Sequence, residues 1–66
     1  MNVTLQLPED DARFLLSQLG RLEQTVESEL VHTDAPQMQH ELAADLRRVQ
    51  AVRAQLASAI EVGPAR

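Results

Sequence analysis

Polar and apolar residues alternate strictly at the start of the chain. Every second residue between positions 2 and 7 is apolar, and these residues are Val3, Leu5 and Leu7. A period of two is typical of a half-buried strand, so the pattern predicts a β-strand at about residues 2–7. Because an isolated strand is unstable, we expect it to lie across helices or to pair, most simply with the same strand of a second copy.

The next segment has the apolar spacing of a long amphipathic helix. Pro8 suits a first helical position, and the acidic residues at 9–11 favour the positive end of the helix dipole. The spacing keeps its phase through Gly20, although glycine costs roughly 1 kcal/mol against alanine inside a helix. We predict one helix over about residues 8–31. Its apolar stripe consists of Ala12, Leu15, Leu16, Leu19, Leu22, Val26 and Leu30.

A short turn and a second helix follow. The turn is expected at about residues 32–35, where Asp34 resembles an N-cap and Gln37 completes a capping-box pattern. The second helix is predicted over about residues 35–62, because a Gly-Pro stop signal opens a frayed tail at 63–66. Its apolar stripe consists of Met38, Leu42, Leu46, Val49, Val52, Leu56, Ala59 and Ile60.

Together these elements predict a mainly α, single-domain fold over residues 1–66. A short N-terminal β-strand is followed by an antiparallel two-helix hairpin, because so short a turn forces the helices to fold back. Residues whose numbers sum to about 68 then face each other. Two helices cannot enclose both stripes, so we expect two hairpins to pack as a homodimeric four-helix bundle. The predicted partner contacts are Leu16, Leu19, Leu22, Val26, Leu46, Val49, Val52, Arg53 and Leu56.

Composition narrows the classes of function. The 66 residues include no cysteine, which excludes disulfides and thiolate metal sites. The net charge is −4, and an acidic chain without a basic run is a poor binder of nucleic acid or membrane surfaces. The apolar runs are too short to span a bilayer, and the start lacks the pattern of a secretory signal. We therefore expect a cytoplasmic protein with no membrane partner.

Few side chains are placed for catalysis or metal binding. His32 and His40 do not share a helix face, so they lack the spacing of a metal site. The acidic run at 9–11 lies at a helix start, where stabilisation of the dipole is the commoner role. The sequence contains no phosphate-binding glycine loop, nucleophile elbow or metalloprotease helix. It therefore predicts neither an enzyme nor a cofactor or metal site.

Two charged residues interrupt the apolar stripe of the second helix. Under the facing rule, Asp45 comes near Arg21 and Arg53 comes near Asp11. Interhelical ion pairs that fix the register are the favoured interpretation, and a polar spot that recognises a partner is the alternative. Phe14, the single aromatic residue, lies off the first stripe. It either packs under the strand or forms an exposed contact for another protein.

An acidic helix start, a leucine-rich first helix, a His-Thr-Asp turn and a leucine-rich second helix occur together in this chain. The segments that carry these features are Leu7–Ala12, Leu15–Leu19, Glu29–Asp34 and Leu42–Leu56. In these features the chain resembles a group of short uncharacterised bacterial helical-hairpin proteins. The resemblance implies a helical hairpin and offers no activity.

The predicted order of one strand and two helices is also similar to that of ribbon-helix-helix repressors and antitoxins. In that family the strand pairs with a second copy and enters the major groove. The resemblance implies that Asn2, Thr4 and Gln6 contact bases and that Gly20 is a turn between short helices. The function we favour is a homodimeric protein-interaction module, an adaptor or small regulatory subunit. A DNA-binding regulator or antitoxin is the alternative.

Overall fold

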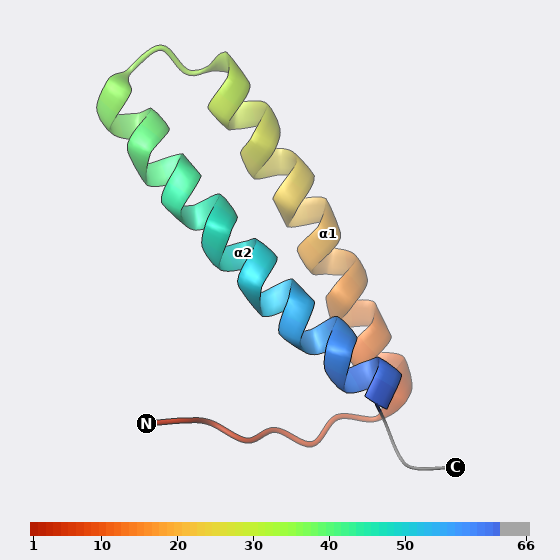
Figure 1. Ribbon diagram of the computed structural model, residues 1–66. Coiled ribbons are helices and arrows are strands. Elements are labelled where there is room, and N and C mark those ends of the chain that lie inside the picture. Colours follow the sequence, from red (N-terminus) through yellow and green to blue (C-terminus); the bar gives the residue numbers. More distant parts are fainter. Residues whose placement is uncertain (63–66) are drawn as a thin grey trace.

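The computed structural model describes residues 1–62, which form two antiparallel helices joined by a short connection (Figure 1). Helix α1 spans Glu9–His32 and helix α2 spans Pro36–Val62. Each helix begins one residue later than the sequence pattern predicts, and α1 continues through Gly20 without a break. The tail expected to fray at residues 63–66 lies outside the described residues.

The prediction of an N-terminal strand is wrong. Residues 1–8, which we call the N-terminal arm, have no regular secondary structure, and no strand occurs within residues 1–62. A strand needs a second strand to accept and donate its backbone hydrogen bonds, and the rest of the hairpin is helical. The arm instead leaves the start of α1 and crosses towards α2 (Figure 1).

Helix α1 begins without a side-chain cap. Pro8 occupies the cap position with φ −54° and ψ 150° and makes no side-chain hydrogen bond, but its carbonyl accepts a 3.0 Å hydrogen bond from the amide of Ala12. Three acidic residues fill the first turn, where negative charge stabilises the helix dipole. One of them, Glu9, also pairs with Arg13 one turn later, with 2.9 Å between Oε2 and Nε. Charge and backbone geometry therefore define this end of α1.

The connection between the helices is built differently from the predicted capping box. Thr33 is extended, with φ −96° and ψ 139°, and α2 begins at Pro36. The Ala35 carbonyl accepts the first helical hydrogen bond, from the amide of Gln39 at 2.9 Å. The Gln39 side chain reaches back and donates to the Thr33 carbonyl, also at 2.9 Å. Because Ala35 holds the cap position, the prediction of Asp34 as the cap is wrong.

The hairpin is a single layer of two helices with a small core. The Cα atoms of the chain, with the arm included, extend over 49 × 26 × 14 Å, and α1 and α2 alone make up the layer. Among the residues whose burial is described, Ala12 at 8% and Val26 at 7% exposure form the core, and no large side chain is fully buried. Both broad sides of the layer therefore face solvent in a single copy.

Candidate interaction surface

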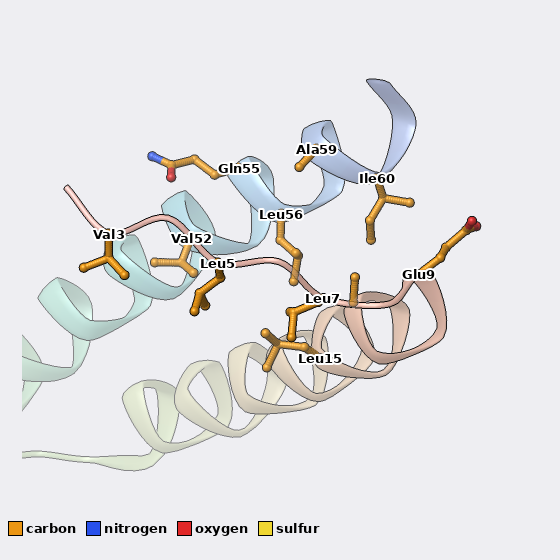
Figure 2. Close-up of a pocket in the computed structure, with 11 residues that line it drawn as sticks. Val3, Leu5, Leu7, Glu9, Leu15, Val52, Gln55, Leu56, Ala59 and Ile60 are labelled. Carbon is orange, nitrogen blue, oxygen red and sulfur yellow. The ribbon is translucent and has the colours of Figure 1, made fainter. Parts of the chain in front are cut away.

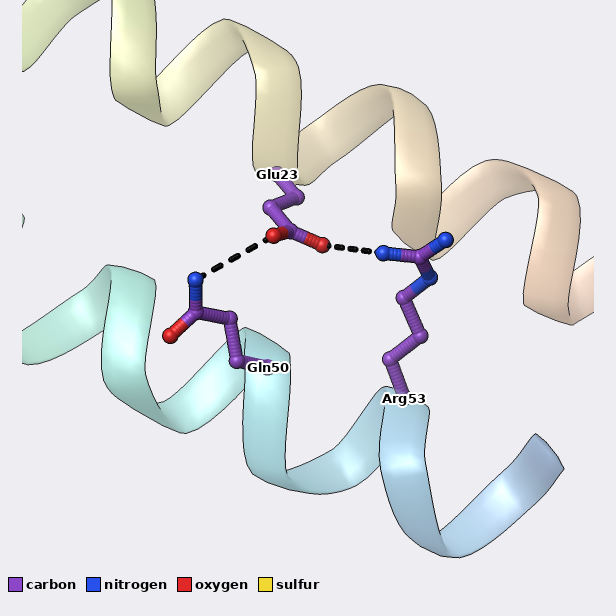
Figure 3. A network of polar contacts seen from close by, with 3 residues as sticks. All are labelled: Glu23, Gln50 and Arg53. Atoms are coloured by element: carbon purple, nitrogen blue, oxygen red, sulfur yellow. Dashed lines mark hydrogen bonds and ion pairs between the residues drawn. The ribbon is translucent and has the colours of Figure 1, made fainter. Parts of the chain in front are cut away.

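A polar network crosses between the helices on one broad side of the hairpin, which we call the polar face (Figure 3). The Glu23 carboxylate accepts a 2.6 Å hydrogen bond from Arg53 Nη1 through Oε1 and a 3.2 Å bond from Gln50 Nε2 through Oε2. The hydrogen bonds from Gln50 and then Arg53 lower the pKa of Glu23, although desolvation acts in the opposite direction. Glu23 is therefore charged at neutral pH, and it links α1 to α2 at two points.

Arg53 forms an interhelical ion pair, as the sequence predicts, but the predicted partners of the ion pairs are wrong. Arg53 pairs with Glu23, not Asp11, and the described residues show no ion pair between Asp45 and Arg21. Helical side chains lean towards the N-terminus of their own helix. In an antiparallel pair the side chains of Glu23 and Arg53 therefore lean towards each other, whereas those of Asp11 and Arg53 lean apart.

Gly20 lies beside this network. A methyl group at Gly20 would find the Arg53 guanidinium as its nearest neighbour, with Nε at 3.8 Å. Because Gly20 has no side chain, the Arg53 side chain lies close against α1. Arg53 remains 47% exposed, and ion pairs so open to water contribute little to stability. We interpret the network as a device that fixes register and keeps this face polar.

The other broad side, which we call the apolar face, carries a groove (Figure 2). The groove has a volume of about 510 Å³ and lies between the arm, the start of α1 and the end of α2. Val3 and Leu5 border it from the arm but stay 77% and 73% exposed, so the arm does not fill it. The remaining lining residues are Leu7, Glu9, Ala12, Leu15, Val52, Gln55, Leu56, Ala59 and Ile60.

Apolar residues extend this face beyond the groove towards the connection. On α1, Leu22 follows Leu15 after seven residues, and on α2, Met38 precedes Val52 by fourteen. Residues seven apart lie on nearly the same side of a helix. The exposed fractions are 39% for Leu15, 46% for Leu22, 49% for Met38 and 46% for Val52. These four residues therefore mark two exposed rows that run along the hairpin.

The predicted partner contacts fall into three groups. Val26 is buried in the hairpin and offers almost no surface to a partner. Leu22 and Val52 lie open on the apolar face, whereas Arg53 belongs to the polar face. The others are half-buried between the helices or at their edges, and they are Leu16, Leu19, Leu46, Val49 and Leu56.

The sequence pattern does not predict that Met38, Leu15 and the arm lie on one exposed surface. Met38 and Leu15 belong to the predicted apolar stripes but not to the predicted partner contacts. The width of the stripes is the one signal that residues at the edge of a stripe stay exposed. Phe14 is 65% exposed and does not border the groove. Of its two expected positions, packing under Val3 and Leu5 is therefore wrong, and the side chain is exposed.

The residues proposed to contact DNA lie in the arm. Asn2, Thr4 and Gln6 are exposed there and belong to no strand. The helix break expected at Gly20 is absent, because α1 continues through it. Within residues 1–62 the geometry that the ribbon-helix-helix interpretation requires is therefore missing, and no observation favours that function.

The described part of the chain holds no group of three or more histidine, cysteine or acidic residues that could bind a metal ion. None of its helices combines the length and the apolar character needed to cross a membrane. Comparison of the chain with protein-family models, curated proteins and solved structures found no match. Both resemblances noted from the sequence therefore stay predictions.

Proposed function

We propose that this chain is a small protein-interaction module that works as a homodimer of hairpins, as an adaptor or regulatory subunit in the cytoplasm. The observation that carries the proposal is the exposure of large apolar residues on a hairpin whose described core consists of Ala12 and Val26. Exposed apolar patches larger than those of ordinary monomers mark contact sites.

The accessible surface of a single copy supports association. It measures 5616 Å², whereas a compact monomer of this mass has about 4,200 Å². The excess is roughly 1,400 Å² per chain, which exceeds the ~800 Å² that each partner buries in a standard interface and lies in the range of obligate homodimers. A second copy of the hairpin would cover surface of the required size.

The ways in which a small domain can gain stability also support association with a second copy. Domains below about 70–80 residues usually add disulfides, a metal or another subunit to their core. This chain has no cysteine, and its described residues hold no metal-binding group. Association is therefore the remaining source of stability among the three.

Phe14 supports the role as adaptor. It is 65% exposed, lies off the α1 stripe, and makes no part of the groove. Aromatic side chains dominate binding energy where a pocket on a partner takes them up. Phe14 is thus available to a third protein while the apolar faces of two copies cover each other.

Sedimentation velocity tests the proposal across chain concentrations from about 1 to 100 µM. The expected result is a species of twice the 7.3 kDa chain mass at tens of micromolar, with dissociation, if any, at the dilute end. A species of 7.3 kDa throughout this range would contradict the proposed homodimer.

A further inference from the structure

We infer that the second copy packs on the apolar face, so that Leu15, Leu22, Met38 and Val52 of one copy are covered by the same face of the other and the arms lie within the interface. This inference rests on the proposed homodimer and specifies its surface. It commits to a second copy of this chain as the occupant, because one broad side of the hairpin has the area that each partner buries in a standard interface.

The size of the face agrees with that of a homodimer interface. Helices of 24 and 27 residues are about 36 and 40 Å long and about 10 Å wide, so one side of the pair offers on the order of 800 Å², which is the area that each partner buries in a standard interface. Pairing two such sides converts one layer of helices into two stacked layers, the usual minimum for a domain with its own core. The two rows of apolar side chains would then be enclosed between four helices.

The opposite side of the hairpin is a poor place for a second copy. The Glu23–Arg53 pair lies there, and the surface around it also includes Arg13, Arg21 and Glu27. Covering these groups would remove water from ionised side chains, and this cost often exceeds what their mutual attraction returns. The groove on the apolar face, by contrast, is lined by one charged residue, Glu9.

Asp45 is the charged residue in the α2 row of the apolar face. It stands seven residues from both Met38 and Val52 and is exposed. A single polar residue in an apolar row reduces affinity but restricts how two copies can align, as polar core residues do in coiled coils. Asp45 therefore acts in this interface as a residue that selects one alignment.

The arm and groove complete the surface. The groove of about 510 Å³ is open because Val3 and Leu5, which border it, remain mostly exposed. Apolar side chains from a second copy would fill the groove and cover the arm in one step. The alternating apolar residues of the arm thus contribute side-chain contacts to the interface without forming a strand.

Val52→Arg tests the inference, with Val31→Arg as the matched control. Val52 is 46% exposed and Val31 is 78% exposed, so a single hairpin accommodates arginine at either position, and Val31 lies outside the two rows. Because Val52→Arg places a long ionised side chain where apolar side chains of the second copy would pack, we expect dimerisation to weaken by at least ~100-fold. Val31→Arg should retain the wild-type dissociation constant, measured by sedimentation.

Val52→Ala is the second variant, because alanine adds no charge and favours helix. We expect it to weaken dimerisation by about tenfold through lost apolar contact, while circular dichroism retains the helix content. If the wild type is a dimer and both Val52 variants dimerise as well as it does, the apolar face is not the interface, although the homodimer itself stands. A monomeric wild type would instead overturn the proposed function together with this inference.

Discussion

Val26→Ala is expected to lower the free energy of unfolding by about 2 kcal/mol, because two methyl groups are lost from the core and a cavity remains. Val26 is 7% exposed, and Ala12 is the other buried residue among those described. Helix propensity offsets part of the loss, since alanine is the better helix former. For a chain of this size, the change corresponds to a melting temperature about 10 °C lower.

Val31→Ala provides the matched control on the same helix. It deletes the same two methyl groups from a side chain that is 78% exposed, so we expect a change within about 0.5 kcal/mol. Urea unfolding of all three proteins at one chain concentration gives the comparison, because the stability of a dimer depends on concentration. Equal losses in the two variants would show that Val26 does not lie in the core.

Gly20→Ala is expected to raise the free energy of unfolding by about 1 kcal/mol, since glycine in a helix interior costs that much against alanine. Gly20 is eleven residues into α1, and an added methyl would meet Arg53 Nε at 3.8 Å, which is ordinary contact. The melting temperature should rise by about 4–8 °C.

Ser17→Ala serves as the control for Gly20→Ala. Ser17 is exposed on the same helix, and replacing serine by alanine gains only about 0.5 kcal/mol of helix propensity. Thermal unfolding followed by circular dichroism ranks the variants, with Gly20→Ala the more stable. A Gly20→Ala protein that melts below the wild type would mean that the backbone at Gly20 is not helical.

The helices could be predicted from the sequence because their signals are local. The acids at 9–11 and the unbroken stripe through Gly20 each act within one or two helical turns, and the observed bounds lie within one residue of those expected. The arm could not be assigned in this way. The same alternation of apolar residues suits a strand and an irregular segment that lies against an apolar groove. Only the presence of a second strand to pair with distinguishes the two structures.

The candidate surface was harder to predict than the helices. A stripe identifies which residues lie between helices but not how each helix is rotated about its axis, and rotation decides whether Leu22 or Leu19 is the more exposed. The partner of Arg53 was missed because the facing rule used residue numbers alone. Long side chains lean along the helix, so residue numbers alone do not predict the contact between Arg53 and Glu23.

In the proposed dimer, two copies cover each other through the apolar face. An NMR sample that mixes ¹³C-labelled with unlabelled chains reports contacts between copies directly, because the filtered spectrum retains only cross-peaks from a labelled to an unlabelled chain. We predict such cross-peaks for the methyl groups of Leu22 and Val52 and none for those of Val31. A dimeric sample in which Val31 gives intermolecular cross-peaks while Leu22 and Val52 give none would contradict the claim.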